Sequence, residues 1–459
     1  MTILQELEKR VKLQFQKLHQ LLKDDRAKQF RKNFLDMHFY EQGQFFLTMN
    51  ASQRKQFYQI MNPDEVGDMF DTLRDDQLDI SQLLSEMDLK YASEMLSDMY
   101  DDNAADLLEH LDKVEVDRYL TVMAREDANQ LRGLLHYDTE TAGGLMTTDY
   151  VVMQQDVTVQ ETLKALRKFA RTTETIYYIY VIDVNNDLVG VLSLRDLFVH
   201  SDKTLLSSIM THNVISVYVD DEQEEVAQFF RDYEFTSLPV VDHANQLVGV
   251  VTVDDAIEVM DNEAQDDYSK LAGVDVDEDD NSPIKSATSR LPWLITLLFL
   301  GMITATLISH FETLLSKASI LAVFISLITG TAGNAGTQSL AVAVRKLSVE
   351  NNKGRHITKL LLKELVTGLF IGLATGVTIT IVVGIWKHNF VLGFVIGLAM
   401  MVAITVANFA GSLIPMLMSK IGFDPAVASG PFISTLSDLT SVLIYFNIAS
   451  LFMKFFVGM

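Results

Sequence analysis

The chain has 459 residues, enough for about three or four domains. Residues 1–290 carry 56 acidic and 27 basic side chains, whereas residues 291–459 carry only 5 acidic and 10 basic ones. The apolar second part excludes a single soluble enzyme, and the acidic first part excludes a nucleic-acid partner, because phosphates would be repelled. The absence of cysteine excludes a disulfide scaffold and is typical of a reducing cytosol.

The first 140 residues are predicted to form an all-α N domain. The segment Met1–Lys32 is charged throughout, so no signal peptide is expected. Helix starts with acidic first turns are indicated at 62–64 and 101–103. Apolar residues follow each start at helical spacing, and this rhythm of short helices predicts a superhelical array.

An internal repeat follows at 141–262. Its first copy (141–203) opens with Leu-Met-Thr at 145–147, and its second copy (204–262) opens with Ile-Met-Thr at 209–211. Each copy ends on the pattern G-x-x-[S/T]-x-x-D, and alternating strand and helix patterns predict a small α/β unit for each. This pattern and the tandem order of the two copies resemble a pair of CBS domains.

The CBS resemblance implies a cleft that often binds an adenine nucleotide. By that resemblance Ser193 and Asp196 of the first copy, and Thr252 and Asp255 of the second, would hold the ribose. The Arg195 guanidinium would meet a phosphate. A purely structural cleft is the alternative.

An acidic connecting helix and linker is predicted at 263–289. The stretch 254–280 holds twelve acidic residues, including Asp275, Asp277, Glu278, Asp279 and Asp280, against the single base Lys270. Like charges at helical spacing destabilise a helix, so bound divalent cations would relieve the repulsion. The segment is therefore predicted to change conformation with cation concentration; a solvated acidic linker is the alternative.

The last part, 290–459, is predicted to be an all-α domain of five membrane-spanning helices, because each span needs about 20 apolar residues. The predicted spans are Leu291–Glu312, Ala318–Val344, Leu361–Trp386, Phe390–Met418 and Pro425–Phe455. Glycines four residues apart on the third and fourth spans indicate close helix packing. The second connector holds the basic residues Arg345, Lys346, Lys353, Arg355 and Lys359. Positive residues stay inside, so the N-terminus is expected in the cytoplasm and the C-terminus outside.

One acidic residue at membrane depth, Asp438, dominates the prediction of an ion path. It lies 13 residues past Pro425, roughly 20 Å into the fifth span, and a carboxylate there is costly unless it serves an ion. Pro431 is expected to interrupt the helix and free backbone carbonyls. Carboxylate and carbonyl oxygens suit Mg²⁺.

Amide side chains on two other spans have two interpretations. Asn334 and Gln338 share a face of the second span, and either they face the ion path or they form interhelical hydrogen bonds. Asn408 on the fourth span is a weaker case of the same kind. Asp424, at the predicted cytoplasmic mouth, is placed to attract cations.

The order of domains resembles the MgtE family of bacterial Mg²⁺ channels over nearly the full chain. The segments that carry the resemblance are 137–147 at the junction of N domain and CBS pair, 175–181 in the first CBS unit, 290–294 at the first span, and 333–339 and 424–438 in the pore helices. Gly430 departs from the pattern, because some members carry Asn there. The resemblance implies a homodimer in the bacterial plasma membrane, with Asp438 as the pore ligand for hydrated Mg²⁺.

The resemblance also implies a cytosolic Mg²⁺ sensor that closes the pore. The matching positions are Asp102, Asp106, Glu222, Glu224, Glu234, Asp254, Asp255, Glu263, Asp266 and Asp267. Phe235 joins Arg195 and Asp196 at the nucleotide site, which would bind ATP.

The expected function is therefore Mg²⁺ uptake through a channel that cytosolic Mg²⁺ closes, and no enzymatic activity is expected. A carrier for Mg²⁺, Co²⁺ or Mn²⁺ is the alternative, followed by a nucleotide-sensing membrane scaffold. An intramembrane metalloprotease is excluded because the histidines of the second part, His310, His356 and His388, form no HExxH motif.

Overall fold

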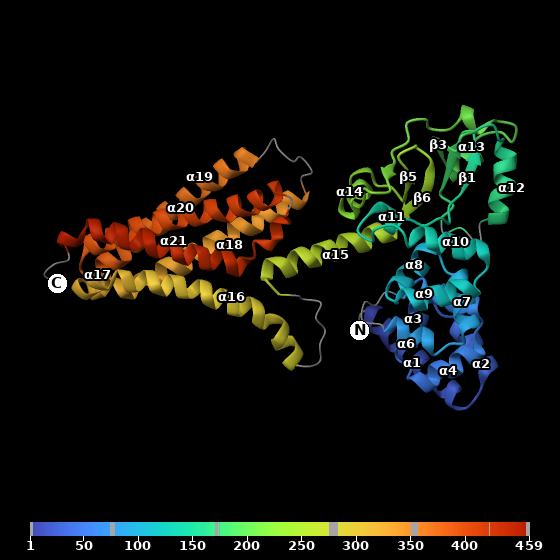
Figure 1. Ribbon diagram of the computed structural model, residues 1–459, viewed down its shortest axis with the longest axis horizontal. Helices are drawn as coiled ribbons and strands as arrows, with labels where there is room; N and C mark the ends of the chain where they lie inside the picture. The colour runs from blue at the N-terminus through green and yellow to red at the C-terminus, as the bar shows by residue number, and fades with distance from the viewer. Residues whose placement is uncertain are drawn as a thin grey trace. The chain divides into compact units, whose positions relative to one another are not determined.

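The computed structural model describes residues 3–73, 79–169, 173, 175–274, 283–349, 357–421 and 423–455. It forms two compact units, Met1–Asp261 and Asn262–Met459, which are described separately (Figure 1). The acidic residues between 275 and 280, and Lys353 and Arg355 of the basic connector, lie outside the described residues.

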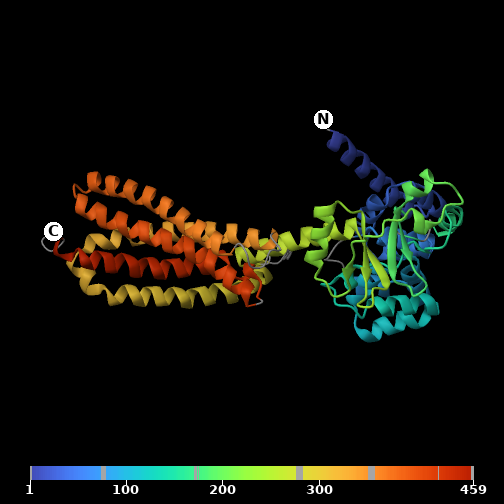
Figure 2. The same cartoon turned by 90° about the horizontal axis from the view of Figure 1, so that it is seen from above.

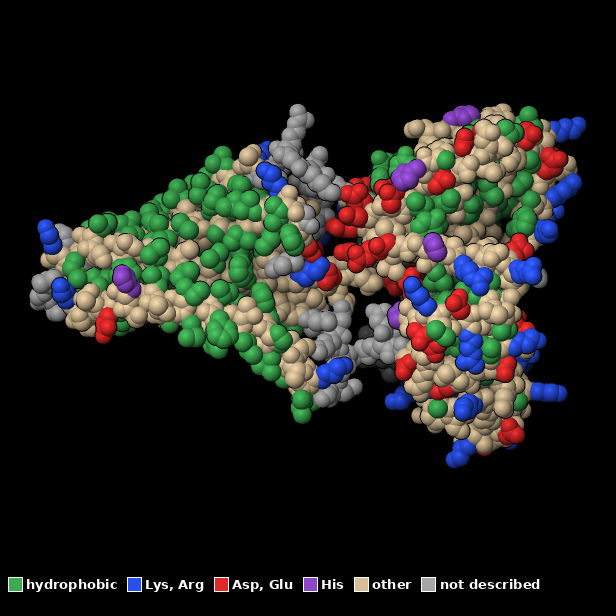
Figure 3. Space-filling model, viewed as in Figure 1, with side chains coloured by type: hydrophobic (Ala, Val, Ile, Leu, Met, Phe, Trp, Pro, Cys, Tyr) green, Lys and Arg blue, Asp and Glu red, His purple; other side chains and the backbone are tan. Residues whose placement is uncertain are grey.

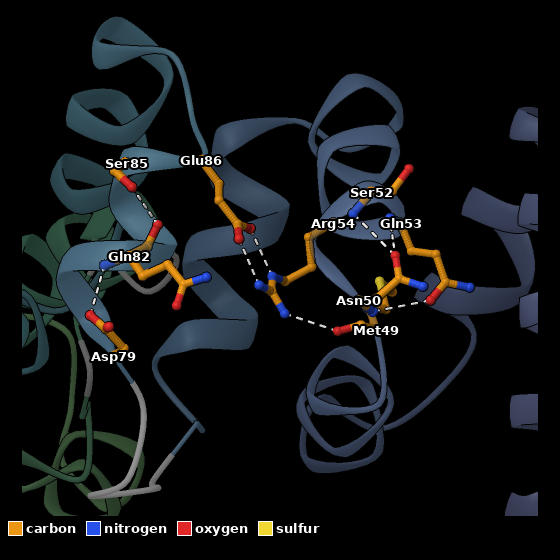
Figure 4. Close-up of polar contacts among 9 residues, drawn as sticks. All are labelled: Met49, Asn50, Ser52, Gln53, Arg54, Asp79, Gln82, Ser85 and Glu86. Carbon is orange, nitrogen blue, oxygen red and sulfur yellow. Dashed lines mark hydrogen bonds and ion pairs between the residues drawn. The ribbon is translucent and has the colours of Figure 1, made fainter.

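The N domain consists of consecutive helices, several of which start with a polar side-chain cap. The helices are α1 (Ile3–Lys23), α2 (Ala27–Leu35), α3 (Phe39–Leu47), α4 (Ala51–Ile60), α5 (Pro63–Phe70), α6 (Ile80–Ser85), α7 (Leu89–Asp98), α8 (Asp101–Glu109), α9 (Lys113–Val122) and α10 (Arg125–Leu134). At α4, Asn50 Oδ1 accepts from the Ser52 and Gln53 amides, both at 3.1 Å (Figure 4). These caps satisfy backbone donors that a helix start leaves unpaired.

The N-domain helices are held together by hydrogen bonds between residues about 30 positions apart, which is the length of one pair of helices. Arg54 donates to Glu86, 32 residues later, at 2.7 Å and 2.6 Å, and also to the Met49 carbonyl (Figure 4). Tyr91 Oη donates to the Met61 carbonyl, 30 residues earlier. Each helix pair thus binds the next, which is the superhelical array that the sequence predicts.

The two α/β copies have the same small mixed sheet. In the first copy β1 (Val152–Gln154) lies parallel to β2 (Tyr178–Ile182), and β2 lies antiparallel to β3 (Leu188–Ser193). The second copy repeats this order with β4 (Val217–Tyr218), β5 (Ser237–Val241) and β6 (Leu247–Thr252). The helices are α11 (Ala142–Leu145), α12 (Val159–Phe169), α13 (Leu194–Val199), the 3-10 turn η1 (Leu206–Ser208), α14 (Gln223–Tyr233) and α15 (Val253–Ala272).

Each copy holds the opening segment of the other. The Thr147 amide donates to the Val250 carbonyl at 2.8 Å, and the Thr211 amide donates to the Val191 carbonyl at 3.0 Å. A Cβ on Gly249 would lie 2.5 Å from Met146 Sδ, so only glycine accepts this contact. Gly190 stands against Met210 in the same way. We call this arrangement the reciprocal exchange.

The second unit contains the five apolar helices, as the sequence predicts. They are α16 (Pro283–His310), α18 (Ile325–Val349), α19 (Ile357–Trp386), α20 (Phe390–Lys420) and α21 (Gly430–Leu451), with α17 (Glu312–Lys317) and the 3-10 turns η2 (Ser319–Phe324), η3 (Pro425–Val427) and η4 (Met453–Phe455) between or after them. Figure 2 shows α18 to α21 side by side, and Figure 3 shows hydrophobic side chains over the visible face of this unit. Residues of α16 are not buried by the described chain.

Glycines set the spacing of α19 and α20. A Cβ on Gly376 would lie 2.6 Å from the Gly397 carbonyl oxygen, and one on Gly372 would lie 2.6 Å from the Met401 carbonyl oxygen. The two backbones therefore touch, as the glycine spacing predicts.

Candidate functional site

One face of α18 is polar and exposed. Ser326, Gly330, Asn334 and Gln338 recur every four residues, and all four are exposed in the single chain. We call this face the polar stripe. Within the described residues of one chain, no side-chain hydrogen bond joins Asn334 or Gln338 to another helix. Both interpretations of these amides therefore stay predictions.

The neighbouring face of α18, next to the polar stripe, packs against α21, which carries Asp438. A Cβ on Gly333 would lie 2.8 Å from Ser434 Oγ, and a Cβ on Gly336 would lie 2.9 Å from Ser437 Oγ. Asp438 follows Ser437 and is only partly buried. Asp438 therefore follows directly on the contact between α18 and α21, at the level of Asn334 and Gln338.

The start of α21 differs from the prediction. The helix begins at Gly430, after η3, so Asp438 lies eight residues from its start, about 12 Å along the axis rather than the roughly 20 Å expected. The prediction that Pro431 interrupts a continuing helix is wrong. Pro431 stands in the first turn of α21, where its missing N–H would have no intrahelical partner.

Asp424 lies before α21 and contacts the end of α15. Its Oδ1 accepts from the Ala426 amide at 2.7 Å, and its Oδ2 pairs with the Lys270 ammonium, which also pairs with Asp266. Burial lowers the pKa of Lys270, but the hydrogen bonds to Asp266 and Asp424 outweigh this and raise its pKa overall. Lys270 thus supplies a positive charge between two predicted metal-binding carboxylates.

Asn408 and an acid that the sequence analysis passed over form a buried network. Asn408 Nδ2 donates to Glu364 Oε2 at 3.1 Å, so Asn408 makes an interhelical hydrogen bond. Glu364 of α19 is only 5% exposed. The expectation of a single acid at membrane depth is therefore wrong. The signal was present, because Glu364 falls within the predicted span 361–386, where any carboxyl is a candidate functional group.

The predicted sensor residues of the first unit meet at α8 and the start of α15. Desolvation, and then the charges of Glu109, Asp255 and Glu258, raise the pKa of Asp106 to about 7. Asp102 is 5% exposed on the same helix. Thr252 Oγ1 donates to Asp254 at 2.6 Å and also to Asp255. Carboxylates from two elements of this unit are therefore brought together.

The other sensor candidates lie on or next to α14 and on the later part of α15. Glu222 precedes the first residue of α14 and Glu224 lies in its first turn, whereas Glu234 ends α14 in a left-handed conformation, φ 55°. Glu263, Asp266 and Asp267 lie on the part of α15 that belongs to the second unit. Within the described ranges, no three acidic or histidine side chains converge as a metal-binding group.

The nucleotide candidates lie at the ends of equivalent strands. Asp196 Oδ2 accepts from the Ser193 amide at 2.9 Å and from Ser193 Oγ at 2.6 Å, which closes the start of α13. Arg195 is exposed and makes no ion pair with described residues. The Phe235 ring stacks on Tyr233, with centroids 5.4 Å apart. Tyr233 was not predicted, because no motif in the sequence marks it.

Models of known families cover most of the chain. Residues 37–140 match an MgtE intracellular N domain, 142–202 and 206–262 match CBS domains, and 325–448 match a divalent cation transporter, MgtE. A magnesium transporter MgtE of Enterococcus faecalis is 57% identical over 97% of this chain and 98% of its own. One of Bacillus subtilis is 38% identical over 82% of this chain and 86% of its own. The crystal structure of the soluble part of a magnesium transporter covers 55% of this chain and 99% of its own, at 46% identity and TM-score 0.54.

Proposed function

The chain belongs to the MgtE family of magnesium transporters, and from this premise we propose that it is a Mg²⁺-selective uptake channel that cytosolic Mg²⁺ closes. It is a multi-pass membrane protein with cytoplasmic N-terminal domains, and it moves ions rather than catalysing a reaction. An N-terminus inside and five spans put the C-terminus outside.

The observation that carries the proposal is the exposed polar stripe beside Asp438. Amides and a carboxyl facing hydrocarbon are costly. A second copy related by a two-fold axis would cover both stripes and bring two Asp438 carboxyls to one axis. The proposed pore therefore runs between two chains, which also gives the exposed α16 a partner.

The chemistry of this face suits hydrated Mg²⁺. Mg²⁺ keeps several of its waters and binds through one or two carboxylates. Asn334, Gln338 and Asp438 offer oxygen only, and softer transition metals prefer nitrogen or sulfur ligands. Asp424 would attract cations toward the mouth when Lys270 releases it.

The proposed sensor is the set of carboxylates around α8, α14 and α15. Repulsion between Asp106, Asp255 and Glu258 would be relieved by a bound divalent cation. Closure follows if Mg²⁺ binds the closed state more tightly than the open state. Glu263, Asp266 and Asp267 extend the same charge along α15.

We propose that a nucleotide such as ATP binds with its ribose and phosphates at the Ser193–Asp196 turn of the first copy and its base against aromatic residues of the second copy. The support is the closed turn of Ser193 and Asp196 with the exposed Arg195 beside it. Phe235 and Tyr233 offer an aromatic face for the base.

The test is the Mg²⁺ current in inside-out patches, with cytoplasmic Mg²⁺ stepped from micromolar to millimolar. A channel with this sensor closes as Mg²⁺ rises. Uptake into vesicles without any current would instead favour a carrier for Mg²⁺ or another divalent cation, and currents indifferent to Mg²⁺ would refute the sensor.

Two variants divide the proposal into pore and sensor. Asp438→Ala should abolish flux, whereas Glu312→Gln, a carboxyl removed outside the spans, should leave it unchanged. Neutralising Asp106 and Asp255 together should raise the Mg²⁺ concentration that closes the channel by about tenfold. Asp117→Asn, an exposed acid on α9, is the matched control.

A further inference from the structure

The membrane unit contains a buried polar network that neither the pore nor the sensor uses. Ser339 Oγ of α18 donates to Glu364 Oε2 of α19 at 3.2 Å, and Asn408 of α20 donates to the same oxygen at 3.1 Å. Asn408 also donates to the Glu364 carbonyl at 3.1 Å, and Ser412 Oγ lies 2.6 Å from Ser339 Oγ. Three helices therefore meet at one carboxyl oxygen.

The surroundings of Glu364 make its carboxyl a hydrogen-bond acceptor. Glu364, Asn408, Ser339 and Ser412 are each at most 5% exposed. No Lys or Arg in the described part of the chain forms an ion pair with Glu364, so hydrogen bonds are the polar contacts that this carboxyl makes there. The two donors need only an acceptor oxygen, which an amide also has.

The network fixes the helix that carries the polar stripe. Ser339 is one turn from Gly336, whose carbonyl oxygen would lie 2.2 Å from a Cβ on Gly411. On its other side, a Cβ on Gly336 would lie 2.9 Å from Ser437 Oγ. At Gly336, α18 therefore packs directly between the backbone of α20 and Ser437 of α21, because glycine has no side chain to separate them. A shift of α18 at Ser339 would consequently move Ser437, the residue next to Asp438.

We infer that Glu364 is a positioning residue for ion passage, which acts as a hydrogen-bond acceptor and holds α18 in register with α21. The inference rests on the proposed function only in taking Asp438 and the polar stripe as the ion path. Glu364 is not a Mg²⁺ ligand in this assignment, since its carboxyl is enclosed by donors from the same chain. Gln in its place would accept the same two hydrogen bonds, whereas Ala would leave Ser339 and Asn408 without their acceptor.

The experiment measures Mg²⁺ uptake by the full-length protein in proteoliposomes, with the half-saturating Mg²⁺ concentration and competition by Mn²⁺. Glu364→Ala should lower the maximal rate by about tenfold or more. Glu364→Gln should stay within about twofold of the wild type and keep both half-saturation and Mn²⁺ competition. Tyr445→Phe is the matched control, because it removes another buried hydrogen bond, from Tyr445 Oη to the Leu321 carbonyl at 2.9 Å.

Several outcomes would overturn the inference. If Glu364→Gln is as slow as Glu364→Ala and needs more Mg²⁺ for half-saturation, the charge is required and Glu364 is a ligand. If Tyr445→Phe loses as much rate as Glu364→Ala, any loosening of the bundle suffices. If Glu364→Ala transports normally while Asp438→Ala does not, the pore proposal stands and the positioning role fails; a wild type without uptake would refute the pore proposal itself.

Discussion

The two α/β copies share one architecture but differ at the helix that follows the last strand. In the first copy β3 leads into α13, with Ser193, Arg195 and Asp196 at the turn; in the second, β6 leads into α15, with Thr252, Asp254 and Asp255 in the same places. The register is equal as well, since Tyr178 pairs with Ser193 and Ser237 pairs with Thr252. A single change of charge, Arg195 against Asp254, makes one turn suited to phosphate and the other to a cation.

The reciprocal exchange joins the two copies to each other, so disrupting it should cause the largest loss of stability. Gly249→Val would force a side chain into Met146, and overpacking of this kind costs about 2–3 kcal/mol. Hydrogen exchange of β5 and β6 in the full chain measures the loss. Gly190→Val should weaken β2 and β3 equally, whereas Gly133→Val, which has open space around it, should leave both copies unchanged. Unequal losses would show that the two copies are not interlocked symmetrically.

The charge difference can be tested by making the first copy resemble the second. Arg195→Asp should weaken ATP binding at least about tenfold, or ~1.4 kcal/mol, because a phosphate would then face two carboxylates. Isothermal titration of ATP into the purified chain measures it. Arg167→Asp, on the exposed side of α12, is the control, and equal losses in both variants would indicate a general effect of net charge.

The opposite variant removes charge from the second copy. Asp254→Asn should raise the Mg²⁺ concentration for channel closure about three- to tenfold, about 1 kcal/mol, because this exposed turn is screened by solvent. Patch recordings measure the midpoint, and Asp156→Asn in the first copy serves as control. An unchanged midpoint would remove Asp254 from the sensor.

The smallest effect is expected at the helix cap of the first copy. Ser193→Ala removes the side-chain acceptor for the Asp196 amide, which should lower the stability of α13 by about 1 kcal/mol. Exchange of the α13 amides measures this loss. Ser193→Gly should cost only a few tenths of a kcal/mol, about what a glycine cap loses, so an equal loss in both variants would show that the cap is not the cause.

Features with a fixed period or local motif could be predicted from the sequence. The five spans follow from the length of apolar runs, and the repeated α/β unit follows from two copies of the same glycine-hydroxyl-acid pattern. The contact of α19 with α20 follows from glycines four residues apart. In each case the cause lies within one helix or one repeat.

The features that were missed depend on residues far apart in the chain. In the sequence, Glu364 is a single polar residue near the end of a predicted span. Only the structure brings it into contact with Ser339 and Asn408, which lie 25 and 44 residues away. The start of α21 was misplaced because apolar content does not distinguish η3 from a helix. The exchange of Met146 and Met210 between copies could not be predicted either, because each packs against a glycine far from it in the chain. Met146 contacts Gly249, about 100 residues later, and Met210 contacts Gly190, about 20 residues earlier.

The polar stripe of α18 also bears on how the protein is made. A newly synthesised chain enters the bilayer as one copy, and one copy leaves Asn334 and Gln338 on a face that its own described helices do not cover. Each amide held against lipid costs several kcal/mol, so the proposed pair would be more stable than a single copy. Pairing soon after insertion would remove that cost, and a copy that stays single would be marked for membrane quality control by the exposed amides of the polar stripe.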